Sequence, residues 1–294
     1  MRFARSGQLS SDIEDRRGRG PVRGRTAAIG GGGLSIGAIV LFVLFQVLGG
    51  GGGDLGSVLD QIGSQVAPPA AQGESIQTGG AATSDQDQFI SFVIDDIQDF
   101  WTQQFTSSDR TYDRSILVLY DGGTGTDGCG FGQAAVGPFY CPADQKVYVD
   151  LTFFGELASR FGAPGDFAQA YVLAHEVGHH VQNLLGISAQ VRSEQQADPG
   201  SENDLSVRTE LQADCLAGVW AFSAFDAQLL ESGDLEEGLR AAAAVGDDSI
   251  QSSAGVPVNS ETWTHGSSEQ RQQWFRTGFD NGDPNLCDTF AGSV

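Results

Sequence analysis

The chain has 294 residues, enough for one or two domains, and its 16 basic and 38 acidic side chains give a formal net charge of −22. The charge is uneven, because seven arginines fall within the first 25 residues and the remainder carries nine basic and 35 acidic residues, a formal net charge of −26. An acidic surface without a basic footprint repels nucleic acid, so we expect no nucleic-acid partner.

An uncharged stretch over residues 26–53 follows the arginine-rich start. Its apolar core, Leu34–Leu48, has 15 residues, fewer than the roughly 20 that span a bilayer, but flanking Ala, Ile and Gly residues lengthen it. A cleaved signal peptide is the alternative. Five glycines and then Asp54 follow the core instead of a small-x-small cleavage site, so we favour a transmembrane anchor at 26–50 in the lipid bilayer. The preceding positive charge predicts a single-pass protein with a basic, disordered segment 1–25 in the cytoplasm and everything later outside.

Residues 51–85 are rich in Gly, Ser, Ala and Gln and predict a flexible linker to a folded domain at 86–294. In that domain, apolar residues at helical spacing predict a helix from Gln86 to near Phe105. Short apolar or alternating runs predict strands at 115–120 and 146–151, separated by a Gly-rich loop at 124–137. The second of these strands is our candidate edge for an added substrate strand.

Beyond residue 151 the pattern becomes helical. The expected helices and their capping residues are 166–186 with Asp166 and Gln169, Ser206 to about Phe225, one opened by Asp234 with Glu237, and one opened by Ser267 with Gln270 that ends before Asn281-Gly282. A few strands followed by several helices predict an α+β domain of about 200 residues with a small sheet.

Four cysteines form an even set in a domain that we expect outside the cytoplasm, so two disulfides are predicted. Of the three pairings, we favour Cys129–Cys141, which closes a short loop, and Cys215–Cys287, which ties a helix to the C-terminus. A cysteine zinc site is less favoured because the chain has no C-x-x-C, and four free thiols are the alternative for the opposite orientation.

The pentapeptide His175-Glu176-Val177-Gly178-His179 carries the clearest chemistry. On a helix, residues four apart share a face, so His175 and His179 can present two imidazoles to one metal ion. Glu176 is rotated by about 100° from that face, so its carboxylate can stand beside the metal and take a proton from water. Apolar residues on both sides indicate a buried helix, which argues against a surface helix that carries the pattern by chance.

A catalytic zinc ion usually has three protein ligands. A local extension of the motif is excluded because Gln182 and Leu185 occupy the positions where that class needs Gly and His. Glu210, 31 residues after the second histidine, is therefore the expected third ligand, with Glu202 or Asp204 as weaker alternatives.

Asp214 shares a helical face with Glu210 because the two are four residues apart. We expect Asp214 to accept a hydrogen bond from the outer ring N–H of a ligand histidine, His175 in particular, and so to fix its tautomer. A solvated acidic helix face is the alternative, but the apolar residues that follow indicate a packed helix.

Two histidines remain. His180 lies off the face of the ligand pair and is expected to support the site or the fold. His265, just before the last predicted helix, is a candidate catalytic residue that could donate a hydrogen bond to the oxyanion, with the charge of Arg271 nearby. A structural role for His265 is equally compatible, and Tyr140 and Tyr148 are other candidates for the donor.

Several segments, together with the metal motif, resemble the bacterial family of putative neutral zinc metallopeptidases, single-pass membrane proteins with a zincin-type domain. The resembling segments are Asp15–Gly18, Gly137–Pro142, Asp150–Phe154, Phe167–Tyr171, Glu210–Cys215, Thr264–Arg271, Gly278–Asp280 and Asp283-Pro284. They cover nearly the whole chain except the linker. The Glu-x-x-x-Asp pair is also similar to a wider group of metalloproteases whose third ligand is Glu. Some of these carry Thr-His-Pro-(x)4-Arg, where this chain has Gly266 in place of the Pro and keeps the spacing from His to Arg.

The resemblance implies a zincin-like metalloprotease domain in the bacterial cell membrane, one Zn²⁺ per chain and cleavage of a peptide or protein substrate. Together with the motif it predicts a membrane-anchored, extracytoplasmic metalloendopeptidase with zinc on His175, His179 and Glu210 and with Glu176 as general base. Two alternatives are a zinc-stabilised extracytoplasmic binding module without activity, and a zinc hydrolase of another bond, such as a cell-wall amide.

Overall fold

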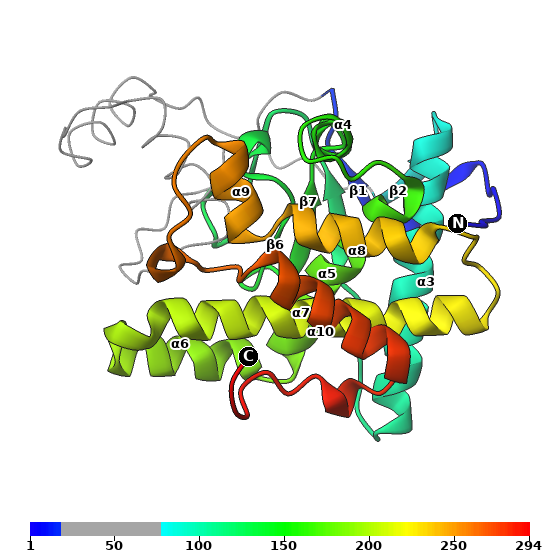
Figure 1. Cartoon of the computed structure of the whole chain (residues 1–294). Coiled ribbons are helices and arrows are strands. Elements are labelled where there is room, and N and C mark those ends of the chain that lie inside the picture. The colour runs from blue at the N-terminus through cyan, green and yellow to red at the C-terminus, as the bar shows by residue number, and fades with distance from the viewer. Residues whose placement is uncertain (19–77) are drawn as a thin grey trace.

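Figure 1 shows the computed structural model of the chain, which describes residues 1–18 and 78–294. The predicted anchor at 26–50 and most of the predicted linker at 51–85 lie outside the described residues. Within the described ranges, no helix is both long enough and apolar enough to cross a bilayer.

A five-stranded sheet has the strand order β2-β1-β3-β7-β6. Its members are β1 (Gln8–Asp15), β2 (Thr78–Ala81), β3 (Ile116–Leu119), β6 (Phe139–Cys141) and β7 (Lys146–Val149). The central strands β1, β3 and β7 are parallel to one another, whereas β2 and β6 are antiparallel edge strands. A second, two-stranded sheet pairs β4 (Gly123–Gly125) with β5 (Phe131–Gln133). The predicted strands at 115–120 and 146–151 are confirmed as β3 and β7.

Side chains of β3 and β7 are buried on both faces of the large sheet. Leu117 and Val147 enter the main core, whereas Val118 and Tyr148 enter a smaller cluster on the other face that includes Phe139. A sheet that is covered on both faces explains why these strands read as nearly continuous apolar runs.

The strand β7 is internal, because it pairs with β3 on one side and with β6 on the other. The prediction that residues 146–151 form an edge for substrate is therefore wrong, and β6 is the edge strand at this end of the sheet. An alternating run shows that a strand is half or fully buried, but it does not show how many neighbours the strand has.

The start of the chain is part of the folded domain. β1 lies between β2 and β3, Ile13 is fully buried, and the backbone N–H of Arg16 donates to the Leu119 carbonyl oxygen at 2.8 Å. Glu14 pairs with Arg16 at 2.6 Å and with Lys146 of β7 at 2.9 Å. The prediction of a disordered segment at 1–25 is therefore wrong for residues 1–18, and the domain does not begin near residue 86. The high density of arginine suggested disorder, but the segment contains a strand whose charged side chains are paired within the fold.

Residues 1–18 and 78–294 share one hydrogen-bonded sheet. The span predicted between them, on which the predicted membrane topology depends, lies outside the described residues.

Helices make up most of the remainder of the fold. They are α3 (Asp85–Ser107), α4 (Thr152–Ser159), α5 (Asp166–Leu184), α6 (Ile187–Ala197), α7 (Glu202–Asp226), α8 (Asp234–Ala244), α9 (Asp247–Ser253) and α10 (Ser268–Asn281). Short 3₁₀ turns lie at Ala134–Val136, Pro199–Ser201, Ser260–Thr262 and Pro284–Leu286. The predicted α+β class with a small sheet and several helices is confirmed. α3 packs on β1, and α5 packs on β6 and β7.

The helix starts were predicted less well than the helices themselves. The Ser267–Gln270 capping box of α10 is confirmed. Asp166 and Asp234 are the first residues of their helices rather than caps, since a glycine precedes each of them. Ser206 lies inside α7 and donates its hydroxyl to the Glu202 carbonyl oxygen at 2.8 Å. A side chain that can cap a helix start can also return a hydrogen bond to the preceding turn.

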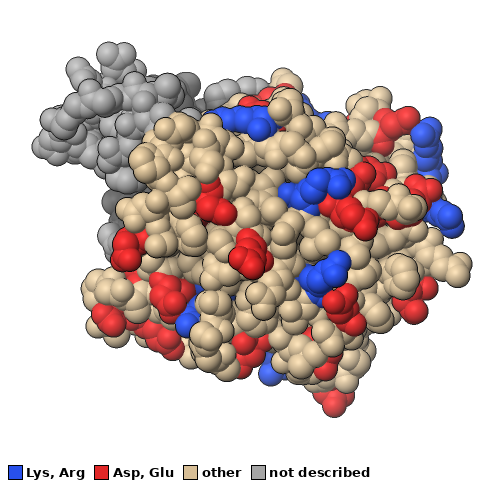
Figure 2. All heavy atoms as spheres, viewed as in Figure 1, with Lys and Arg blue, Asp and Glu red and all other residues tan. Residues whose placement is uncertain are grey.

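Helices α7 and α10 run side by side (Figure 1) in very close contact. A Cβ on Gly218 would overlap the Phe275 carbonyl oxygen, and one on Gly278 would overlap the Cys215 carbonyl oxygen. The disulfide Cys215–Cys287 ties the C-terminal segment to α7, and Cys129–Cys141 is the second bridge, so both predicted pairings are confirmed. Figure 2 shows acidic side chains spread over the face in view, with several gathered at the end formed by α6.

The position of β1 can be tested by cross-linking in the full-length protein. Gln8 and Ala81 are paired across β1 and β2, and both are exposed. We expect Gln8→Cys and Ala81→Cys to form a disulfide in the full-length chain, detected as one linked peptide pair by mass spectrometry.

The matched control combines Gln8→Cys with Glu194→Cys, an exposed position on α6 at the other end of the molecule (Figure 1). This pair should not link. A chain that folds with residues 1–18 across the membrane from the domain would leave the Gln8→Cys/Ala81→Cys pair unlinked as well, and that result would contradict the sheet.

Candidate metal centre

The metal motif lies on α5 and Glu210 lies on α7, two helices that pack directly against each other. Gly178 makes the approach possible, because a Cβ there would lie 3.0 Å from the Ala213 carbonyl oxygen and 3.2 Å from the Ala213 Cα atom. Glycine inside a helix costs about 0.5–1 kcal/mol relative to alanine, so its presence within the motif is explained by packing. The two helical turns that carry the ionisable side chains therefore face each other.

The three predicted ligands converge. The Nε2 atom of His175 lies 3.2 Å from Oε2 of Glu210, and Nε2 of His179 lies 3.4 Å from Oε1 of the same carboxylate. All three side chains are buried, and their ligand atoms lie within 4.8 Å of one another. The weaker alternatives, Glu202 and Asp204, are exposed at the start of α7, where Asp204 pairs with Arg208.

The residues present fit a zinc ion. Two imidazole nitrogens and one carboxylate oxygen are the donor set of many catalytic zinc sites. Three buried polar atoms here, His179 Nε2, Glu210 Oε2 and Glu176 Oε2, have no hydrogen-bond partner in the described part of the chain. Buried polar atoms rarely lack partners, so this cluster needs an explanation, and a cation between the ligands supplies one.

The carboxyl group of Glu176 stands beside the three candidate ligands and lines a cavity together with His175 and Glu210. It is only 4% exposed, and burial raises its pKa above the usual value, although the two ligand histidines oppose this shift. A carboxylate in such surroundings is a stronger base than one in water.

Asp214 is placed as the sequence predicts. Its Oδ1 atom lies 2.9 Å from Nδ1 of His175 and accepts a hydrogen bond from it, which leaves Nε2 of that ring toward Glu210. Arg271 donates to the same carboxylate through Nε at 2.7 Å and through Nη2 at 2.9 Å, and Tyr171 donates its hydroxyl to it. Arg271 therefore neutralises Asp214 in the interior.

The electrostatic field at the ligands favours a cation. Burial lowers the pKa of His175, but the carboxylates of Asp214 and Glu210 raise it more, to about 9. Burial raises the pKa of Glu210, but the opposite effect of His179 and His175 is larger, so the pKa lies well below its usual value. Glu210 is therefore ionised at neutral pH, and the negative surroundings that hold a proton on His175 attract a metal ion as well.

Sequence reasoning missed the partner of the second histidine. The Nδ1 atom of His179 lies 2.8 Å from Oε1 of Gln182, one turn later on α5. The spacing of three residues was a usable signal, since side chains at i and i+3 on a helix are neighbours.

His265 lines the cavity and is 3% exposed. Its Nδ1 atom lies 2.9 Å from Oδ1 of Asp247, and Oδ2 of Asp247 accepts the backbone N–H groups of Thr264, His265 and Gly266. Asp247 therefore fixes both the ring and the loop that carries it. No sequence pattern links a residue at the start of α9 to a histidine 18 positions later, so Asp247 was missed.

The other candidates lie outside the cavity. His180 makes its contacts with the Asp113 carbonyl oxygen at 2.6 Å and the Tyr140 hydroxyl at 2.9 Å. Tyr148 donates its hydroxyl to Asp144. Of the three proposed oxyanion donors, His265 alone lines this cavity.

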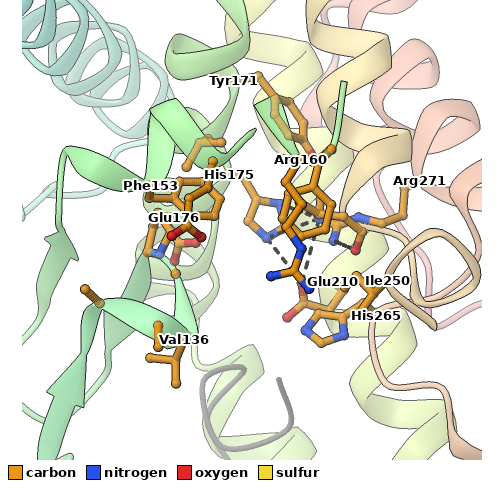
Figure 3. Close-up of a pocket in the computed structure, with 18 of the residues that line it drawn as sticks. Val136, Phe153, Arg160, Tyr171, His175, Glu176, Glu210, Ile250, His265 and Arg271 are labelled. Atoms are coloured by element: carbon orange, nitrogen blue, oxygen red, sulfur yellow. Dashed lines mark hydrogen bonds and ion pairs between the residues drawn. The ribbon is translucent and has the colours of Figure 1, made fainter. Parts of the chain in front are cut away.

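His175 and Glu210 open on a cavity of about 120 Å³. Figure 3 shows Val136 and Phe153 on the side of Glu176, and Ile250 on the side of His265. Most of the remaining lining is also apolar and includes Ala134, Ala135, Pro138, Phe161, Val172, Val245 and Ala254. A cavity of this kind can hold an apolar side chain next to the metal ligands.

Comparison with known proteins gives a family. A family model described as "Putative neutral zinc metallopeptidase" matches residues 1–290. The chain is 45% identical over 292 residues to the uncharacterized protein YpfJ of Escherichia coli K12, covering 97% of each chain. It is 49% identical over 193 residues to the uncharacterized protein Rv2575 of Mycobacterium tuberculosis H37Rv, covering 62% of this chain and 64% of the relative. No solved structure matches the chain.

The packing role of Gly178 gives a prediction. Gly178→Ala should force α5 from α7 and lower the free energy of unfolding by about 1–3 kcal/mol, the usual cost of overpacking. The zinc content of the purified protein should fall with it. Urea unfolding and elemental analysis measure the two effects.

Gly155→Ala is the matched control, because a Cβ on this helical glycine of α4 meets no atom of the described residues within 4 Å. It should leave zinc content unchanged and should not lower stability. Equal behaviour of the two variants would contradict the close contact at Gly178.

Proposed function

The chain belongs to the putative neutral zinc metallopeptidase family, and from this premise we propose that it is a zinc-dependent endopeptidase with a zincin-like domain. The observation that carries the proposal is the convergence of His175, His179 and Glu210 beside the buried Glu176. Zinc, when bound by the three ligands, activates water as a nucleophile and polarises the scissile carbonyl group.

Glu176 acts as the general base in this proposal. Its buried carboxylate takes the proton from the attacking water and passes it to the nitrogen of the leaving amine. The support for this role is its raised pKa, caused by burial, and its Oε2 atom, which has no hydrogen-bond partner among residues 1–18 and 78–294.

His265 stabilises the oxyanion in this proposal. Asp247 holds its Nδ1 atom at 2.9 Å, so the opposite nitrogen, Nε2, is the one available to a substrate. As an imidazolium, the ring can donate a hydrogen bond from Nε2 to the substrate oxygen on which negative charge develops.

The cavity favours a peptidase over a zinc-stabilised binding module. A structural zinc site is usually closed by four protein ligands, whereas three ligands, two of which line a cavity, leave room for water and substrate. Glu176 lines the same cavity, and a purely structural site has no need of a base there.

We propose that the domain works outside the cytoplasm. Two disulfides support an oxidising compartment, because such bonds are rare in cytosolic proteins. Since residues 1–18 share the sheet, they belong to the same side in this proposal. Lipid contact through 26–50 stays a prediction.

The mechanism predicts that Glu176→Gln keeps zinc and loses activity. The amide matches the carboxylate in size but takes up no proton, so turnover should fall by at least about 10²–10⁴-fold. Elemental analysis reports the zinc, and new N-termini in a proteome-derived peptide library, identified by mass spectrometry, report the cleavage.

Glu194→Gln, on the exposed face of α6, is the control and should retain full activity. Full activity in Glu176→Gln would contradict the proposed base. A wild-type protein that binds zinc but cuts no peptide would favour the binding module instead.

A further inference from the structure

We infer that Gln182 and Gln212 are positioning residues that connect the ligand His179 to the backbone carbonyl group of Cys287, and thus to the Cys215–Cys287 disulfide. This inference rests on the metal centre of the proposed function, but not on the reaction that it catalyses.

The first link fixes the tautomer of His179. Gln182 is fully buried, and its Nε2 atom donates to the Thr209 carbonyl oxygen at 2.8 Å and to Oε1 of Gln212 at 3.0 Å. With both donors used, Oε1 is the end of the amide that faces His179. An amide oxygen only accepts, so Nδ1 of His179 carries the proton and Nε2 keeps its lone pair for a metal.

The second link fixes the orientation of the first amide. Gln212 accepts from Gln182 through Oε1 and donates through Nε2 to the Cys287 carbonyl oxygen at 2.9 Å. If the Gln212 amide were reversed, its NH₂ group would face the NH₂ group of Gln182, and its oxygen would face the Cys287 carbonyl oxygen. The Gln212 residue is only 8% exposed. Unpaired polar atoms are costly in such a place, so each amide determines the direction of the next.

The third link is covalent. Cys287 is 1% exposed and is joined to Cys215 of α7, three residues after Gln212. The same C-terminal segment is held to α7 by the Thr289 hydroxyl, which donates to the Arg208 carbonyl oxygen at 2.6 Å. The disulfide thus keeps an acceptor in place at the end of a chain of hydrogen bonds that begins at the metal ligand.

The two ligand histidines are therefore supported differently. His175 contacts the Asp214 carboxylate, whose charge is balanced by Arg271, whereas His179 contacts a chain of neutral amides. The chain of neutral amides fixes which group donates and which accepts in each hydrogen bond, but it places no net charge beside His179. Its effect on zinc binding should come from the orientation of the ring and its proton.

Zinc affinity, measured by competition with a chelator, tests the inference independently of peptide cleavage. Gln182→Met keeps the size of the side chain and removes the acceptor for Nδ1, so the zinc dissociation constant should rise by about 10–100-fold. Gln182→Glu keeps an acceptor for Nδ1, so it should bind zinc within a few-fold of the wild type even where its unfolding temperature falls. Gln98→Met is the matched control, because Gln98 is also fully buried and hydrogen-bonded, to Ser115 and Tyr112, yet lies outside this chain of amides.

The disulfide gives a second, independent test. Cys215→Ser with Cys287→Ser should weaken zinc binding by several-fold, whereas Cys129→Ser with Cys141→Ser removes the other bridge and should leave it unchanged. Gln212→Met should resemble the first pair.

The inference is overturned if zinc affinity merely follows stability, so that Gln98→Met and Gln182→Met weaken binding alike or Gln182→Glu fails to restore it. It is also overturned if the two cysteine pairs have equal effects. A wild-type chain that binds no zinc would overturn the proposed function together with this inference, whereas zinc binding without cleavage would overturn the proposed reaction alone.

Discussion

The close contact between α5 and α7 is the constraint on which the candidate site depends. Glu210 reaches the imidazole pair because Gly178 brings its helix against the Ala213 backbone. The same contact buries the ligands, and burial is what strengthens the electrostatic attraction between the carboxylates and a cation. α10 extends this arrangement, since Gly218 and Gly278 bring it against α7 and carry Arg271 to Asp214. Small residues at helix crossings thus determine the geometry of the charged ones.

Three histidines of the candidate site each have their own support. Asp214 and Arg271 hold His175, the amides of Gln182 and Gln212 hold His179, and Asp247 holds His265. These supports come from α5, α7, α9 and α10, so the site requires these four helices to be folded together. Supports of this kind typically change metal affinity by about 10–100-fold, which makes them part of the site in energetic terms.

The convergence of His175, His179 and Glu210 was predictable from the sequence because helix periodicity acts over four residues. That rule placed His175 with His179 and Glu210 with Asp214, and the only step beyond it was to pair the two helices. The disulfides followed from loop length and compartment. Helix periodicity also places Gln182 beside His179, but a single glutamine does not indicate a metal site. Asp247 and Gln212 were out of reach, because their partners His265 and Cys287 lie 18 and 75 residues away and only the tertiary fold brings them together.

The first strand was the largest error, and it changes what counts as the folded domain. Charge density suggested a disordered basic segment, yet Arg16 pairs with Glu14 two residues earlier, and Arg17 pairs with Asp87 of α3. Lys146 of β7 pairs with the same Glu14 across the sheet. Without β1, β3 would become an edge strand with unpaired backbone groups, and Lys146 would lose its partner Glu14. β3 pairs with β7, and α5 packs on β7, so this damage would reach the helix that carries the metal motif. The smallest unit that can support the proposed activity therefore includes residues 1–18 as well as 78–294.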